Sequence, residues 1–300
     1  MLDKKTFIRK GLNTNIAYKI AQLGVCFGAE SFMKEALKFS IEVTREAFND
    51  EKPVIWCSTF IPSELIYSID AIPFMPEVAA GFASTIGLAD DALVKAEGDW
   101  LNADLCSIHR CGTGLMKEEL LPEPDYIIAS SHLCDGAKKY LQHISYQYDA
   151  PFYLLETPYY KEESYWLAEQ IRNVINELGF EPDFASVFEK SNQAYKYHKE
   201  INKLRKNGPA TLSSERMMNL LPLEFMSFGS KRGVDFYSVL LEDLKKRLNN
   251  EDTVINDQKH RLLWLHLKPY YPQSIFSTLR KKGAVVAFEE YSQLYWNPLD

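Results

Sequence analysis

The sequence predicts an α/β protein in which a parallel β-sheet is wrapped by helices. Short apolar runs alternate with longer segments whose apolar residues recur every three or four positions. The short runs are apolar throughout, which is typical of strands buried on both faces, as in parallel sheets. The same alternation returns near the C-terminus after a long helical stretch, so a second unit of similar type is expected.

The first part of the chain supplies the main sheet. Its predicted strands are residues 52–56, 72–75, 125–130 and 151–155. The third strand is the clearest, because its residues are β-prone and it follows Pro122 and Pro124. Helices are predicted between and around these strands, at residues 14–49, 62–69, 79–96, 102–120, 134–143 and 163–178. Pro62 suits the first turn of its helix, where no backbone N–H is needed.

The later part of the chain is helical before the strands return. Residues 182–250 are predicted to be almost wholly helical, with interruptions at 207–209 and 229–233. Then follow a strand at 261–266, a helix at 273–282 and a strand at 284–288.

We therefore expect three segments. They are a first α/β domain (1–181), a helical connector (182–250) and the start of a second α/β domain (251–300). Two parallel strands are poorly covered on their own. Either the second domain packs on the first, or the sequence is a fragment that lacks later strands.

Composition excludes several classes of protein. The 300 residues carry a formal net charge of −7, and no block of basic residues indicates a nucleic-acid partner. No apolar run is long enough to cross a bilayer, and the N-terminus lacks the apolar core of a signal peptide. We expect a cytoplasmic protein without a membrane partner. In that reducing compartment the five cysteines are free thiols, metal ligands or nucleophiles rather than disulfides.

Three of the cysteines are placed where a parallel sheet carries its site. Cys57 directly follows the first predicted strand, and Cys134 comes four residues after the end of the third. Ligands of open α/β sheets bind beyond the carboxyl ends of the strands. Cys106 lies on the segment between the two strands. Thiolates select zinc and iron–sulfur clusters, although each cysteine alone is more typical of a small buried apolar residue.

The residues that flank these cysteines are more specific. Residues 56–67, WCSTFIPSELIY, contain Cys57 followed by Ser and an aromatic residue, then a Pro-x-Glu-Leu-Ile stretch. Residues 104–112, DLCSIHRCG, contain a Leu-Cys pair with Arg four residues on and a nearby Gly. Residues 134–139, CDGAKK, contain Cys-Asp-Gly followed by lysines. In this order the three motifs resemble those of the 2-hydroxyacyl-CoA dehydratase and benzoyl-CoA reductase family, and residues 261–300 resemble the opening of its second α/β domain.

The resemblance implies an enzyme subunit that holds a [4Fe-4S] cluster through Cys57, Cys106 and Cys134. Three cysteine ligands leave one iron open to substrate. The resemblance further implies an acyl-CoA substrate, a homologous second subunit, identical or different, and a separate ATP-dependent activator with its own iron–sulfur cluster. The reaction would be radical dehydration of a 2-hydroxyacyl-CoA or reduction of an aromatic acyl-CoA, both by one-electron transfer to the thioester.

Four further residues matter to this hypothesis. Ser58 could bond a cluster sulfur or a substrate hydroxyl, or cap a turn. Glu77 follows the second predicted strand and is a candidate proton acceptor. Cys111 is five residues beyond Cys106, which places the two side chains about 140° apart around a helix. Both thiols could therefore face one cluster only if the helix bends. His109 flanks a proposed ligand cysteine and could lower the charge of the cluster or hold a carboxylate or phosphate, but a helix-surface residue is the more usual interpretation. The alternatives to an enzyme are a fully ligated electron-transfer or scaffold protein, and an α/β protein whose thiols are buried or bind zinc.

Overall fold

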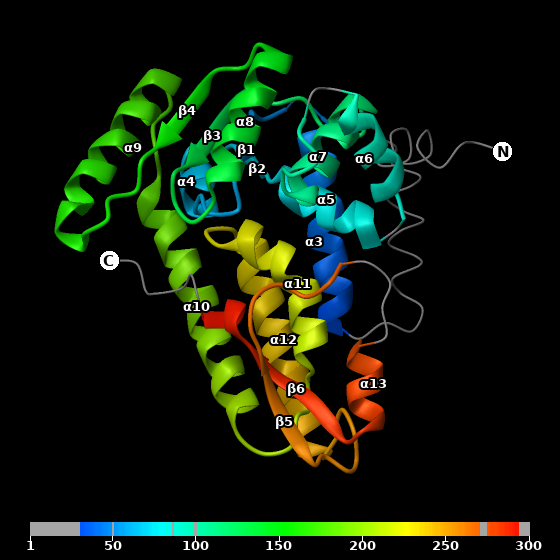
Figure 1. The fold of residues 1–300 in the computed structure, drawn as a ribbon. Helices are drawn as coiled ribbons and strands as arrows, with labels where there is room; N and C mark the ends of the chain where they lie inside the picture. The colour runs from blue at the N-terminus through cyan, green and yellow to red at the C-terminus, as the bar shows by residue number, and fades with distance from the viewer. Residues whose placement is uncertain (1–30, 50, 86, 99–100, 271–274, 294–300) are drawn as a thin grey trace. The chain divides into compact units, whose positions relative to one another are not determined.

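The computed structural model describes residues 31–49, 51–85, 87–98, 101–270 and 275–293 (Figure 1). The chain divides into two compact units. Among the described residues, unit 1 comprises the range 41–184, and unit 2 comprises 31–40 together with 185–293. Helix α3 (Ser31–Ala47) contributes residues to both.

Unit 1 contains a four-stranded parallel sheet in the order β2-β1-β3-β4. Its strands are β1 (Val54–Cys57), β2 (Ile72–Phe74), β3 (Tyr126–Ser130) and β4 (Phe152–Leu155). All four residues of β1 and the last four of β3 are buried, as the unbroken apolar runs predict. The entrance to β3 is fixed by Asp125, whose carboxylate accepts a hydrogen bond from the Val54 amide at 2.7 Å.

Helices flank this sheet (Figure 1). They are α4 (Ser63–Ser68), α5 (Pro76–Thr85), α6 (Ala89–Glu97), α7 (Ser107–Lys117), α8 (Asp135–Tyr148) and α9 (Ser164–Leu178), with a 3₁₀ turn at Lys161–Glu163. Trp56 is fully buried, and its indole N–H donates to the Pro122 carbonyl at 3.1 Å. The α/β class and the parallel sheet are therefore as predicted.

Unit 2 combines helices with a smaller sheet. Its elements are α10 (Phe184–Lys206), α11 (Ser214–Ser227), α12 (Lys231–Asn249), β5 (His260–Trp264), α13 (Ile275–Lys281), β6 (Ala284–Glu289) and a 3₁₀ turn at Glu290–Gln293. β5 and β6 pair in parallel. A core of Met218, Leu221, Phe276 and Val286 joins α11 and α13 to β6.

Several predicted boundaries differ from the structure. The predicted helix 79–96 is two helices, α5 and α6, separated near Gly87, whose φ of +75° interrupts a helix. The helix predicted from residue 102 begins at Ser107. The helix predicted from residue 14 is described only from Ser31 onward, and the start of the one predicted at 273 also lies outside the described residues. The division at residues 181 and 250 stays a prediction.

None of the helices within the described ranges is both long enough and apolar enough to cross a membrane.

Candidate functional site

The three predicted ligand cysteines occupy element ends in unit 1. Cys57 is the last residue of β1 and is fully buried. Cys106 is exposed and is the N-cap residue of α7. Cys134 is the N-cap residue of α8, and its sulfur accepts a hydrogen bond from the Ala137 amide at 3.3 Å. Two of the three thiols thus lie at helix N-termini, where amide N–H groups favour an anion.

The loops after β1 and β3 lie against each other at the carboxyl edge of the sheet. The two strands pair in parallel, with Cys57 opposite Ile128. Phe60, in the loop after β1, contacts His132, in the loop after β3, with perpendicular rings and centroids 6.1 Å apart. Because Cys134 follows His132 by two residues, this contact brings the segments of Cys57 and Cys134 together.

The N-terminal turns of α7 and α8 are also adjacent. The His109 imidazole of α7 stacks on the Tyr140 ring of α8, with centroids 5.0 Å apart and planes inclined by 14°. A Cβ atom on Gly136 would lie 3.1 Å from His109 Cε1 and 3.7 Å from Cys134 Sγ. Glycine therefore permits the close approach of the first turn of α8 to His109, one helical turn from Cys106.

Glu77 links Cys57 to this pair of helices. Its side chain is only 9% exposed, and Oε1 lies 4.0 Å from His109 Nε2. Burial raises the pKa of Glu77 to about 7, and burial lowers the pKa of His109 to about 4. His109 is therefore neutral at pH 7. Burial, and then the charge of Glu77, raise the pKa of the Cys57 thiol far above its usual value.

Several buried polar atoms around this chain of contacts meet no donor or acceptor at standard hydrogen-bond geometry within the described residues. They are Ser58 Oγ, both carboxylate oxygens of Glu77, His109 Nδ1 and the Tyr140 hydroxyl. Buried polar groups are usually satisfied, so their gathering beside Cys57 is typical of a site that receives a ligand or water.

Cys111 points elsewhere. It is 3% exposed, and its Sγ lies 3.9 Å from the Ala80 carbonyl of α5. Burial raises its pKa to about 11. The thiol therefore packs between α7 and α5, whereas Cys106 is exposed at the start of α7.

The described residues contain no group of three or more His, Cys, Asp or Glu side chains close enough to share one metal ion. A four-iron cluster bonds each thiolate to a different iron, so its cysteine ligands stand further apart than those of a single ion. The donor set fits such a cluster, because Cys57 ends a strand of the sheet and the other two thiols, Cys106 and Cys134, lie at the N-termini of two adjacent helices.

Sequence reasoning misplaced one residue of this site and missed another. His109 was expected on a helix surface, but it is 4% exposed and stacked; that interpretation is wrong because α8 covers this face of α7. Tyr140 was not predicted as part of the site. Tyr140 lies three residues after Ala137 and four before Ile144, and both of these are buried. This apolar spacing marks the inner face of α8 and could have indicated that Tyr140 is buried.

The known proteins that this chain resembles are all named as acyl-CoA dehydratase components. The sequence model for 2-hydroxyglutaryl-CoA dehydratase, D-component, matches residues 58–300. The chain is 20% identical over 297 residues to the (R)-phenyllactyl-CoA dehydratase alpha subunit of Clostridium sporogenes, covering 89% of this chain and 73% of that relative. It is 21% identical over 241 residues to the (R)-2-hydroxyisocaproyl-CoA dehydratase alpha subunit of Clostridioides difficile, covering 73% of this chain and 58% of that relative. Because the family match spans most of the sequence, the chain belongs to the 2-hydroxyglutaryl-CoA dehydratase D-component family.

Proposed function

We propose that this chain is the iron–sulfur subunit of an ATP-activated radical acyl-CoA dehydratase, with Cys57, Cys106 and Cys134 as the ligands of a [4Fe-4S] cluster. One observation carries the proposal: the segments that bear the three thiols converge at the carboxyl edge of the unit 1 sheet. Phe60 and His132 join the segments of Cys57 and Cys134, and His109 and Gly136 join those of Cys106 and Cys134.

The surroundings suit an anionic group. The N-termini of α7 and α8 direct backbone N–H groups and the positive ends of their helix dipoles toward Cys106 and Cys134. A thiolate at Cys57 is unfavourable without a positive charge nearby, because the residue is fully buried. Metal coordination deprotonates a thiol outright, so it would supply that charge.

A bound cluster supplies one electron at a time, and its open iron supplies a Lewis acid for an oxygen of the thioester or the 2-hydroxyl group. Ser58 is proposed to donate a hydrogen bond from its buried hydroxyl to the substrate. Glu77 is proposed to accept a proton from substrate carbon. Its carboxylate is buried, burial raises its pKa to about 7, and it is close enough to Cys57 for its charge to raise the pKa of that thiol. The neutral imidazole of His109 packs against Gly136 and so holds the first turn of α8 in place.

The two curated relatives are alpha subunits by name. We infer that this chain also works with a homologous second subunit, and that it receives electrons from an ATP-dependent activator. The substrate is an acyl-CoA. Reduction of an aromatic acyl-CoA, the second reaction that the sequence motifs imply, remains the alternative reaction for the same site. A cytoplasmic location, expected from the sequence, belongs to the same proposal.

The test is anaerobic purification followed by assay of iron and acid-labile sulfide, with visible and EPR spectra. We expect about four irons per chain, lost in Cys57→Ser, Cys106→Ser and Cys134→Ser but retained in Cys111→Ser, which is the matched control. Protein without iron, or iron unaffected by the three substitutions, would contradict the cluster.

A second arm separates an enzyme from an electron carrier. Purified activator, ATP and candidate 2-hydroxyacyl-CoA or aromatic acyl-CoA thioesters are added, together with the candidate partner subunit. Turnover supports the enzyme. Iron that depends on Cys111 as well, with no turnover of any thioester, would indicate the alternative function, a non-catalytic electron-transfer or scaffold protein.

A further inference from the structure

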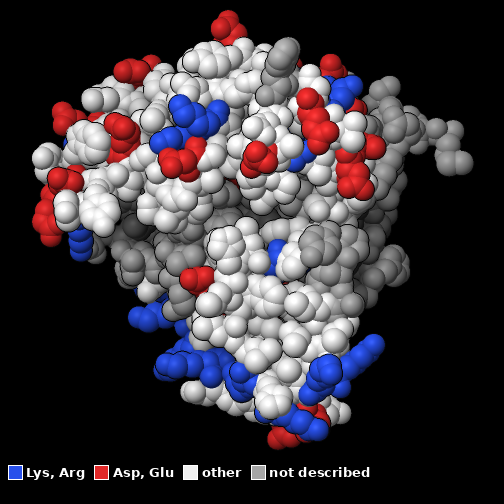
Figure 2. Space-filling model, viewed as in Figure 1, with Lys and Arg blue, Asp and Glu red and all other residues white. Residues whose placement is uncertain are grey.

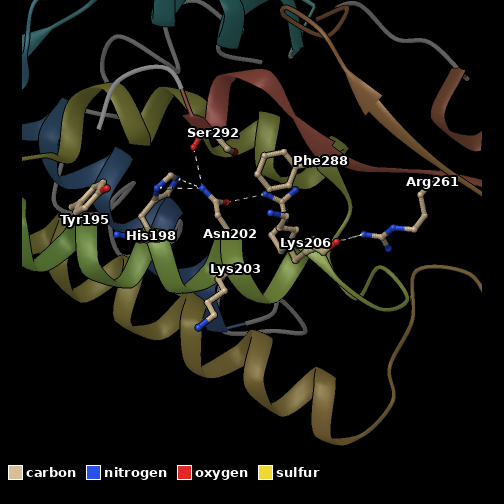
Figure 3. A pocket seen from close by; sticks show the side chains of 10 residues that line it. Tyr195, His198, Asn202, Lys203, Lys206, Arg261, Phe288 and Ser292 are labelled. Carbon is tan, nitrogen blue, oxygen red and sulfur yellow. Dashed lines mark hydrogen bonds between the residues drawn. The ribbon is translucent and has the colours of Figure 1, made fainter. Parts of the chain in front are cut away.

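Unit 2 contains a cavity that the proposed chemistry does not use. Its volume is about 570 Å³, within the range of small-molecule sites. Figure 3 shows that its walls come from α10, from β6 and the turn that follows, and from Arg261 on β5. The lining residues are Tyr195, His198, Lys199, Asn202, Lys203, Arg205, Lys206, Arg261, Phe288 and Ser292.

The cavity is strongly basic. None of its lining residues is Asp or Glu. Lys199, Lys203 and Lys206 follow one another at four- and three-residue spacing along one side of α10, and no carboxylate pairs with them in the part of the chain that the structure describes. The Arg261 guanidinium donates to the backbone carbonyls of Gly208, Arg205 and Lys206, which hold its position without neutralising its charge.

The floor of the cavity is rigid and its own charges are balanced. Arg205 is 4% exposed and donates two hydrogen bonds, at 2.7 and 2.6 Å, to the buried carboxylate of Glu289. Its Nε meets no acceptor within the described residues. Asn202 donates to the Ser292 carbonyl at 3.0 Å (Figure 3). Glu289 is thus paired with Arg205. A second buried carboxylate behind this wall, Glu224, lies 3.9 Å from His198, and burial raises its pKa well above the usual value, so neither carboxylate pairs with the lysines.

The basic cavity lies in the positively charged part of an otherwise acidic chain. Residues 185–300 contain 18 Lys and Arg against 13 Asp and Glu, a formal charge of +5, whereas residues 1–184 contain 16 against 28, a charge of −12. Figure 2 shows Lys and Arg gathered at the end of unit 2 that carries β5 and α13. An acidic protein with a local basic cavity concentrates positive potential there.

Two aromatic rings add apolar wall to this basic cavity. Tyr195 and Phe288 are half-buried lining residues, and the Arg205 guanidinium lies 5.1 Å from the Phe288 ring centre. Cationic side chains beside aromatic surface are the combination that recognises phosphate groups attached to a flat or apolar body.

From this geometry we propose that the unit 2 cavity binds a phosphate-bearing small molecule, whose phosphates contact Lys199, Lys203, Lys206 and Arg261. The proposal does not rest on the iron–sulfur function, because every lining residue lies in unit 2 and no thiol takes part.

The test is calorimetric titration of the full-length protein with inorganic pyrophosphate, at low and at physiological salt. Saturable binding that weakens with salt is expected. The double variant Lys203→Glu/Lys206→Glu should bind at least about tenfold more weakly, since each reversal replaces an attractive contact by a repulsive one. Both lysines are exposed, so the fold is retained; circular dichroism checks this.

Lys196→Glu is the matched control. Lys196 is exposed on the same helix but does not line the cavity, so this variant should bind as the parent does. Lack of saturable pyrophosphate binding by the parent protein, unchanged binding by the double variant, or an equal loss in Lys196→Glu would each overturn the proposal.

Competition against pyrophosphate identifies the source of the phosphates. Displacement by ADP and not by coenzyme A indicates a free nucleotide, and displacement by coenzyme A indicates the carrier of an acyl group. Titrating iron-free and iron-loaded protein in parallel keeps failure of this proposal distinct from failure of the proposed cluster.

Discussion

The imidazole of His109 stacks on the Tyr140 ring, with centroids 5.0 Å apart and ring planes only 14° from parallel. This contact joins α7, whose N-cap is Cys106, to α8, whose N-cap is Cys134. The relative position of two candidate ligands therefore depends on a pair of side chains that are not ligands themselves.

The close approach behind this stack can be tested with Gly136→Ala. A new Cβ would lie 3.1 Å from His109 Cε1, so the imidazole has to shift. We expect lower stability and lower iron content than in the parent. In a His109→Ala background the same substitution should be neutral or stabilising by up to about 1 kcal/mol, because alanine favours a helix over glycine. Urea unfolding of the four proteins measures this coupling; equal effects in both backgrounds would argue against it.

Replacing Cys111 by alanine should affect packing and leave the cluster intact. The thiol is buried against the Ala80 carbonyl, so its removal leaves a small cavity. We expect a loss of about 1 kcal/mol in the free energy of unfolding and unchanged iron per chain. A fall in iron comparable to that in Cys57→Ser would make Cys111 a ligand.

Glu77→Gln tests the proposed proton acceptor. The amide keeps the shape of the side chain but cannot accept a proton from carbon. We expect kcat to fall by about a hundredfold or more, with iron content and EPR spectrum retained. Glu64→Gln, at the start of α4, is the control and should keep its activity. Equal activity of the Glu77 variant and the parent would remove Glu77 from the mechanism.

His198 predicts a pH dependence of stability in unit 2. Burial, and then the charge of Arg205, lower its pKa to about 3 from 6.5. The unfolded chain therefore binds more protons than the folded one between these two values, and stability falls as pH decreases below about 6.5. At pH 5 the contribution is about 2 kcal/mol. His198→Gln should abolish it, measured as a smaller difference between denaturant midpoints at pH 8 and pH 5; an unchanged difference would exclude His198 as its source.

The contact between His198 and Glu224 also depends on these shifted pKa values. His198 Nε2 lies 3.9 Å from Glu224 Oε1. Burial, and then the charge of Glu289, raise the pKa of Glu224 well above its usual value. At neutral pH the His198 imidazole is uncharged, so this contact is not an ion pair.

Arg205 and Glu289 form a true buried ion pair, with both side chains at most 1% exposed. Removing one partner leaves the other charged and desolvated. Glu289→Gln or Arg205→Met should therefore each destabilise by roughly 3–5 kcal/mol. The double variant Arg205→Met/Glu289→Leu should lose clearly less than the sum, measured by denaturant unfolding. Additive losses would show that the pair is not coupled.

The strands of unit 1 were predictable because their signal is local. The runs ending at Trp56 and Ser130 are apolar on both faces, and only a parallel sheet covered by helices buries such runs. The positions of Cys57 at the end of β1 and of Cys134 just beyond β3 followed directly. Boundaries were less predictable, as at Gly87, because one left-handed residue can end a helix without disturbing the apolar period.

The sequence by itself determined the α/β class, the strand that precedes Cys57 and the motifs that indicated the family. Only the tertiary structure decided that His109 is buried beside Gly136, that Cys111 faces Ala80, and that Arg205 pairs with Glu289 beneath a basic cavity. The partners in the last two of these contacts are 31 and 84 residues apart. Their positions are set by the packing of whole elements, which no short pattern in the sequence encodes.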